Sequence, residues 1–247
     1  IDYVRVERDG VTSGADTTAD DIDFITSLST SAAGGADTIT TGSGNDIIVG
    51  GRFNDLIHAG NGNNIVVGDS ATITAVNENH TRFGTQTITV GRIETITTGD
   101  GGADTIRTGS GMDMIMGGAG ADRIDGGAGD DIIAGDNAVL DRTNRVNNFT
   151  NLLFETLTGT LIYSEYSVPQ VDNLPRNQPG GAPVWGDMTL TLLDHSFAEQ
   201  ATPGSNKFGD DYIAGGAGND RIFGGLGNDI IQGDGSIDNP AVSATRL

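Results

Sequence analysis

The stretch GGAGADRIDGGAGDDIIAGD, residues 117–136, contains two nine-residue units followed by a Gly-Asp pair. Each unit has glycine at positions one, two and four, aspartate at position six and isoleucine at position eight. Glycine adopts the positive φ angles of tight turns, and β-branched isoleucine favours strands. Because strand side chains alternate between two faces, position eight points inward and its two neighbours point outward. Each unit therefore predicts a glycine-rich turn followed by a short strand.

The same frame recurs in three blocks, at 32–67, 99–134 and 206–232. Position eight is Ile or Val in every unit, and position six is aspartate in every unit except the one that carries Asn64. The position-six aspartates are Asp37, Asp46, Asp55, Asp104, Asp113, Asp122, Asp131, Asp211, Asp220 and Asp229. A short period repeated in tandem indicates a solenoid, in which each coil buries its apolar side chain against the next coil.

Two units make one coil, so alternate units are expected to stack about 4.8 Å apart along one edge. The stacking brings like charges together: Asp37 over Asp55, Asp104 over Asp122, Asp113 over Asp131 and Asp211 over Asp229. Two carboxylates this close repel by about 1 to 4 kcal/mol. A hard divalent cation reverses the repulsion, and coordination by carboxylate and carbonyl oxygens alone favours calcium. The repeat therefore predicts several bound Ca²⁺ ions.

The units resemble the G-G-x-G-x-D-x-U-x repeat of RTX proteins, the hemolysin-type calcium-binding family. The resemblance implies an all-β fold, a parallel β-roll stabilised by calcium, here in three blocks with irregular strand and loop excursions. It implies that the position-six aspartates supply carboxylates and that the glycine turns supply carbonyl groups. The best-matching turn glycines are Gly118, Gly120, Gly127, Gly129, Gly216, Gly218, Gly225 and Gly227. It also implies one-step bacterial export, with folding on calcium binding outside the cell.

Some units depart from the repeat. Asn64 lacks a carboxylate, so the metal site that it shares with Asp46 is expected to be weaker. Large residues at 52–53 and 207–208 replace the small residues that are usual in two of the glycine turns. These changes predict local irregularity in the first and third blocks.

A Gly-Asp pair ends each block and places an aspartate at position two, as Asp69, Asp136 and Asp234. We expect these three carboxylates to be metal ligands that close the blocks. The alternative is that each is a turn residue whose side chain accepts a hydrogen bond from its own backbone.

The pattern divides the chain into segments around the blocks. They are leading strands (1–31), the first block (32–69), a strand excursion (70–98), the second block (99–136), a long excursion (137–205), the third block (206–234) and a tail (235–247). Apolar or β-branched stretches predict strands at 22–28, 71–76, 93–98, 138–140 and 188–193. The long excursion is expected to hold strands within 152–167 and a Pro-rich loop at 168–185. Trp185 is expected to anchor this loop onto the sheet, and the alternative is that it binds a ligand or partner.

Composition narrows the function further. The 247 residues carry 39 Gly and 34 acidic against 13 basic residues, for a net charge of -21, and no cysteine. Such a surface disfavours a nucleic-acid partner, and no apolar run is long enough for membrane insertion. The apolar content of 36% is thin for an ordinary core. The excess of negative charge is best explained if many of the carboxylates are ligands of bound cations, whose positive charge the sequence does not include.

No catalytic constellation stands out. Asp194-His195-Ser196 has the residue types of a triad, but a triad is built from separated segments. We therefore expect a non-catalytic calcium-binding segment of a large secreted or cell-surface bacterial protein, such as a stalk, adhesin, surface-layer or matrix element. The alternatives are an accessory region of an exported enzyme and a module that binds glycan, ice or another surface ligand. Self-association along the roll axis is a further alternative.

Overall fold

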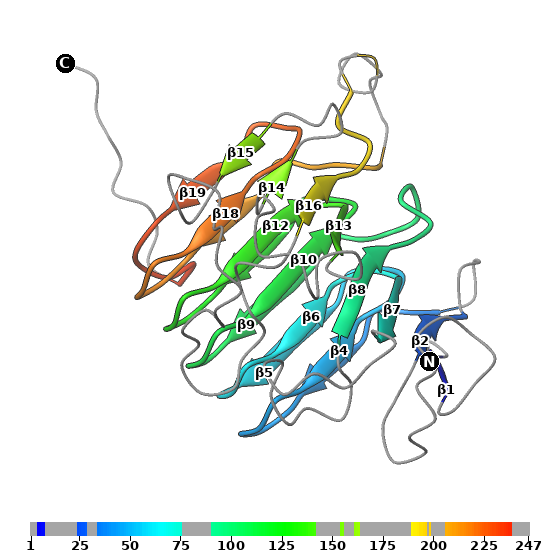
Figure 1. The fold of residues 1–247 in the computed structure, drawn as a ribbon, viewed down its shortest axis with the longest axis horizontal. Helices are drawn as coiled ribbons and strands as arrows, with labels where there is room; N and C mark the ends of the chain where they lie inside the picture. Colours follow the sequence, from blue (N-terminus) through cyan, green and yellow to red (C-terminus); the bar gives the residue numbers. More distant parts are fainter. Residues whose placement is uncertain are drawn as a thin grey trace, which may run out of the picture.

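A computed structural model describes residues 4–7, 24–28, 34–75, 90–141, 154–155, 161–163, 189–196, 198 and 206–238. Its strands form two parallel sheets and an antiparallel sheet beside them (Figure 1). The all-β parallel roll predicted from the repeat is thus confirmed. None of the described residues belongs to a helix long and apolar enough to cross a bilayer. The predicted Pro-rich loop and Trp185 lie outside the described residues.

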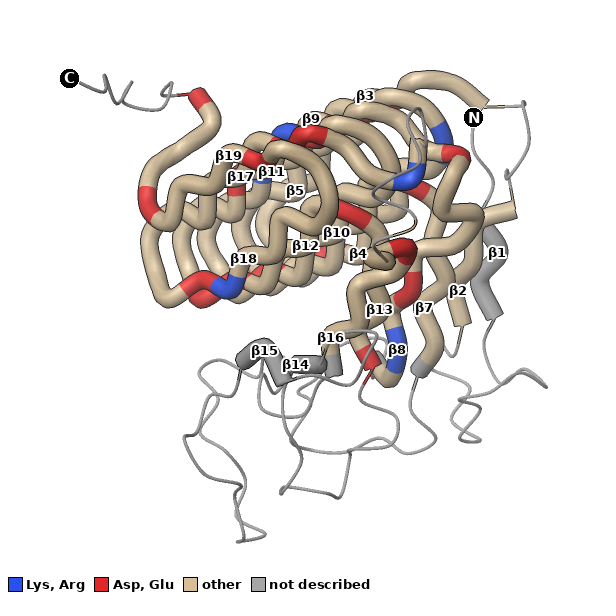
Figure 2. The backbone as a smooth tube through the Cα atoms, turned by 90° about the horizontal axis from the view of Figure 1, so that it is seen from above, with Lys and Arg blue, Asp and Glu red and all other residues tan. Residues whose placement is uncertain are grey.

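The two parallel sheets are the walls of one roll. Wall 1 consists of Thr38–Thr40 (β3), Leu56–Gly60 (β5), Thr105–Thr108 (β9), Arg123–Asp125 (β11), Tyr212–Ala214 (β17) and Ile230–Gln232 (β19). Wall 2 consists of Ile47–Val49 (β4), Ile65–Val67 (β6), Met114–Gly118 (β10), Ile132–Asp136 (β12) and Arg221–Phe223 (β18). Consecutive units alternate between the walls, so Figure 2 shows them as opposite sides of a stack of coils.

Position-eight side chains fill the space between the walls. Their apolar cluster, which we call the inner core, includes Ile48, Ile57, Val66, Ile106, Ile115, Ile124, Ile133 and Ile213. These residues are at most 5% exposed, as the alternation in each strand predicts. In the inner coils, one buried branched residue per unit therefore sets the register of each coil on the next.

The three blocks stack as one continuous roll, which the sequence alone left open. Wall 1 runs across the two seams through the pairs β5–β9 and β11–β17, and wall 2 through β6–β10 and β12–β18. Hydrogen-bonded position-six residues are 18 apart within a block, but 49 and 89 apart across the seams. Each excursion is thus an insertion within a single glycine turn. The chain leaves after Gly68-Asp69 and returns near Gly102, whose N–H donates to Asp69 Oδ1.

The excursions contribute an antiparallel sheet. Its order is Val4–Glu7 (β1), Phe24–Ser27 (β2), Ala71–Ala75 (β7), Val90–Thr95 (β8), Ala138–Asp141 (β13) and Thr189–Leu192 (β16). Five of the strands predicted beside the blocks are found here, as β2, β7, β8, β13 and β16. Phe154–Glu155 (β14) pairs with Leu161–Tyr163 (β15) inside the range predicted for strands in the long excursion.

A second apolar cluster, the outer core, lies between wall 2 and the antiparallel sheet. Wall 2 contributes Ile65, Val67, Met114, Met116, Ile132 and Ala134, and the antiparallel sheet contributes Ile25, Ile73, Ile93, Leu140, Leu190 and Leu192. Positions seven and nine of wall 2 do point away from the inner core, as expected, but the third sheet covers them. Most of them are accordingly apolar. The core is accordingly larger than the composition suggested.

The outer face of wall 1 is crossed by the segment 236–238. The Asp125 carboxylate on β11 accepts hydrogen bonds from Ser236 Oγ at 2.5 Å and from the Ile237 N–H at 3.1 Å. Arg107 on β9 pairs with Asp238 at 2.6 Å. Ile237 is 3% exposed, so this segment packs closely on the wall.

Candidate metal centres

The position-six side chains form two rows that run along the roll. Ladder 1 contains Asp37, Asp55, Asp104, Asp122, Asp211 and Asp229, and ladder 2 contains Asp46, Asn64, Asp113, Asp131 and Asp220. In each step the backbone N–H of one residue donates to Oδ1 of the next, at 2.7–3.0 Å. All four stacked aspartate pairs predicted from the sequence are present. The same ladders continue across both seams.

The second carboxylate oxygen has a different environment. Oδ2 of Asp46, Asp104, Asp113, Asp122, Asp131 and Asp211 is buried and has no hydrogen-bond partner. A buried polar atom without a partner is costly, and native structures contain few of them. Its recurrence at one position of the repeat indicates that an absent partner belongs there.

Two of these oxygens, Oδ2 of Asp122 and of Asp131, face the glycine at position one of their own unit, and Oδ2 of Asp104 and of Asp211 face Gly68 and Gly135 of the Gly-Asp pairs. A Cβ atom built on Gly126 would lie 2.8 Å from Asp131 Oδ2 and 2.6 Å from the carbonyl oxygen of Gly215 on the next coil. Gly117 has the equivalent neighbours, Asp122 Oδ2 and the Gly135 carbonyl oxygen, still closer. A carboxylate oxygen and a carbonyl oxygen thus converge on a space that a side chain would fill.

The turn glycines predicted from the repeat all have positive φ. They are Gly118, Gly120, Gly127, Gly129, Gly216, Gly218, Gly225 and Gly227, with φ between 85° and 150°. At Gly127, with φ 85°, a Cβ would also collide with the carbonyl oxygen of Gly109 on the stacked turn. Glycine is therefore required here both for the backbone conformation and for the close approach of successive turns.

The donor set fits a hard cation. Among the residues described above, no three His, Cys, Asp or Glu side chains cluster as a metal site. A cation between two coils would therefore be held by ladder carboxylates and by backbone carbonyl oxygens. Oxygen ligands of this kind suit Ca²⁺, which takes six to eight of them in flexible geometry.

Burial raises the pKa of several aspartates of the two ladders. Burial is the largest cause throughout, and it raises the pKa of Asp104 to about 9, that of Asp131 to about 8, that of Asp211 to about 7 and that of Asp113 to about 6. The pKa of Asp122 is also well above its usual value, because of burial and then the charges of Asp104 and Asp211. Without a cation, these groups hold protons in the fold that they release in the unfolded chain.

We expect the metal-free protein to be most stable near pH 4 and to lose stability as the pH rises toward 8. The folded state binds more protons than the unfolded state across this window, so each rise in pH favours unfolding. Thermal unfolding followed by circular dichroism in metal-free buffer measures the effect. Saturating calcium should remove it near neutral pH, and a metal-free melting temperature that rises from pH 5 to pH 8 would contradict it.

The aspartates of the Gly-Asp pairs lie outside the ladders. Asp69 accepts the Gly102 N–H at 3.0 Å and the Ala119 N–H at 2.5 Å, both from the second block. Asp136 does the same for two N–H groups of the third block, at 3.2 and 2.6 Å. In these contacts Asp69 and Asp136 accept hydrogen bonds from the block that follows and not from their own backbone. The sequence analysis did not predict these hydrogen bonds between blocks. Asp234 is exposed, beside a hollow at the open end of the roll.

The large residues that interrupt the repeat lie at the seams. Arg52 pairs with Asp100, at the start of the second block, and its guanidinium lies 4.9 Å from the ring centroid of Phe53. Lys207 Nζ pairs with Asp194 Oδ1 at 2.7 Å. The first ion pair joins the first two blocks, and the second joins the third block to the excursion before it, so these large residues have a structural role.

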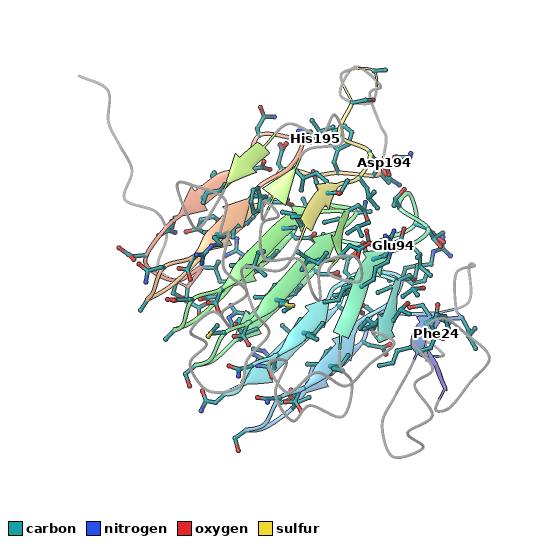
Figure 3. All side chains as sticks on the ribbon, in the orientation of Figure 1. Phe24, Glu94, Asp194 and His195 are labelled. Carbon is teal, nitrogen blue, oxygen red and sulfur yellow. The ribbon has the colours of Figure 1, made fainter. Side chains whose placement is uncertain are left out.

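Acidic side chains outside the ladders also have partners. Figure 3 shows Asp194 and His195 together after β16, well apart from Phe24 on β2. Glu94 on β8 accepts from Arg92 Nε at 3.0 Å. Within the Asp194-His195-Ser196 sequence, Asp194 thus forms an ion pair with Lys207.

Comparison with known proteins agrees with the geometry. The family model of the RTX calcium-binding nonapeptide repeat matches four times, at residues 31–57, 40–71, 98–133 and 207–239. The matches cover the three blocks and the Gly-Asp pair of the first and the third. Neither the curated proteins nor the solved structures gave a significant match to the chain.

Proposed function

We propose that this chain, which carries RTX calcium-binding nonapeptide repeats, is a structural β-roll segment of a larger secreted or cell-surface bacterial protein and folds when it binds calcium. RTX repeats imply Ca²⁺ binding and are typical of secreted proteins. The observation that carries the proposal is the row of buried Oδ2 atoms without hydrogen-bond partners in both ladders.

The ligands that we assign are oxygens on facing coils. The position-six carboxylates supply Oδ2, and carbonyl groups of the glycine turns supply the remaining oxygens, as at Asp131 and Gly215. Bound calcium supplies positive charge between the carboxylates. The chain's own part is to hold these oxygens in register through the N–H to Oδ1 bonds and the inner core. Because calcium binds the folded state alone, its binding free energy adds to folding stability.

The continuous roll favours a role as a rigid spacer. The blocks share both walls, and the antiparallel sheet covers wall 2 along the inner coils. Three β layers joined by two cores resist bending better than separate short rolls would. A stalk, surface-layer or matrix element needs this property, and extracellular calcium modules bind with Kd of about 10⁻⁴–10⁻³ M. Inside the cell such sites would be empty, which suits export of an unfolded chain.

The surface-ligand alternative has less support. Wall 2 is covered by the antiparallel sheet, and wall 1 is crossed by residues 236–238. On wall 1, Arg107 and Arg123 make contacts within the molecule, with Asp238 and with the Ile237 carbonyl respectively. An accessory region of an exported enzyme would use the same calcium-coupled folding. The other domains of the parent protein would distinguish this role from that of a rigid spacer.

Calcium titration tests the proposal. Metal-free protein at pH 7.5 is expected to have weak β signal in far-ultraviolet circular dichroism and to gain it at roughly 10⁻⁴–10⁻³ M calcium, the range of extracellular modules. Magnesium at the same concentration should be a poor substitute, because it demands octahedral geometry and dehydrates reluctantly. An identical spectrum in chelator and in calcium would show the mechanism to be wrong.

A further inference from the structure

Asn64 is the one ladder residue that is not an aspartate, and its side chain is placed differently from theirs. Its Oδ1 accepts the Asp46 N–H at 3.0 Å, as ladder aspartates do for their neighbours. Its Nδ2 donates to the carbonyl oxygens of Gly60 at 3.2 Å and of Gly62 at 3.1 Å, both in its own glycine turn. Asn64 is itself 1% exposed, and the hydrogen bonds that its side chain makes are part-buried.

The aspartates on the same ladder lack this arrangement. Oδ2 of Asp113 and of Asp131 is a buried acceptor without a hydrogen-bond partner, where Asn64 has the donor Nδ2. At Asp131 this oxygen converges with the carbonyl oxygen of Gly215 on the next coil, so two acceptors face one space and a positive charge is needed between them. At Asn64 the amide hydrogens point at the carbonyl groups. One side-chain atom faces an N–H and the other faces two carbonyls, so the hydrogen-bond pattern fixes which is oxygen and which is nitrogen.

We propose that the Asn64 amide takes the place of a calcium ion, so that this turn closes without metal. The inference rests on the proposed function, because it presupposes that the aspartate turns bind calcium. An amide satisfies the Gly60 and Gly62 carbonyls with neutral donors, so this turn keeps its hydrogen bonds in chelator. The sequence predicted a weak metal site shared by Asn64 and Asp46. On this proposal Asn64 is not a metal ligand.

The position of Asn64 gives the substitution a consequence for the roll. Its own N–H donates to Asp113 Oδ1 across the first seam, at 2.7 Å. The calcium-independent turn thus lies at the junction of the first two blocks. It supplies a fixed coil against which neighbouring coils can stack once calcium reaches them.

Two converse substitutions test the proposal. Asn64→Asp replaces the donor by an acceptor, so it should bind one more calcium ion per chain than the wild type and melt at a lower temperature in chelator. Asp131→Asn supplies an amide at an aspartate position of the same ladder. It should bind one ion fewer and melt at a higher temperature in chelator. Bound calcium is counted by equilibrium dialysis and atomic emission at saturating calcium, and melting is followed by circular dichroism.

The outcomes separate this inference from the proposed function. If the wild type binds no calcium, the proposed function fails and the inference fails with it. If the wild type binds calcium but Asn64→Asp leaves both the ion count and the melting temperature in chelator unchanged, the inference alone is overturned. If Asn64→Asp does not fold even in calcium, Asp131→Asn decides, because an unchanged ion count in that variant overturns the inference.

Discussion

Replacing Gly117 with alanine is expected to destabilise the calcium-bound roll by about 3 kcal/mol or more, because overpacking costs about 1–3 kcal/mol before any loss of metal binding. Gly117 does not have a positive φ, so alanine causes no backbone strain. Its new Cβ would collide with Asp122 Oδ2 and with the carbonyl oxygen of Gly135. The carbonyl belongs to the backbone of a buried coil and cannot move aside. The methyl group would thus occupy the space where two proposed calcium ligands converge.

Gly233 supplies the matched control. It stands at the same position of the frame, at the open end of the roll, and a Cβ there would meet nothing within 4 Å. Urea unfolding in saturating calcium compares the two variants, and calorimetry gives their calcium affinities. Gly233→Ala should behave as the wild type does. If Gly117→Ala and Gly233→Ala have equal stability and equal calcium affinity, the oxygen-lined space beside Gly117 does not bind calcium.

The ladders were predictable because one period governs both the core and the charges. Most units bury position eight, and this holds position six of alternate units in register. The four predicted aspartate pairs follow from that register alone. Continuity across the seams was not predictable in the same way, since the excursions separate partners by 49 and 89 residues. The first two Gly-Asp pairs held the missing signal, because each is the first half of a turn that is completed after an excursion.

The outer core had a signal that was overlooked. Positions seven and nine are apolar in the wall 2 units of β4, β6, β10 and β12, as at Ile65 and Val67, but polar in many wall 1 units, as at Thr38 and Thr40. This alternation from unit to unit shows which wall is covered. Reading each unit alone hides it, because only every second unit carries the apolar pair. The protein with a net charge of -21 therefore does not have a thin core. The carboxylates of the ladders still need cations.

Asp69 and Asp136 act, in our interpretation, as docking carboxylates between blocks, and Asp69→Ala should therefore cost about 2–6 kcal/mol. The estimate is two buried N–H groups left without an acceptor, at about 1–3 kcal/mol each. The groups belong to Gly102 and Ala119, on successive coils of the second block. Loss of both bonds should weaken the first seam and broaden the unfolding transition in urea, as the first block begins to unfold separately.

Asp234→Ala is the control, because Asp234 is the equivalent residue at the open end and is exposed. Its unfolding curve should match that of the wild type. Asp69→Asn distinguishes docking from metal ligation. An amide keeps one acceptor and most of the volume, so a docking residue should lose part of its stabilisation while the number of bound calcium ions stays the same. A loss of one ion in Asp69→Asn would instead make Asp69 a calcium ligand, as the sequence first predicted. The seam would then be held by metal, and the two N–H bonds would serve to orient its ligand.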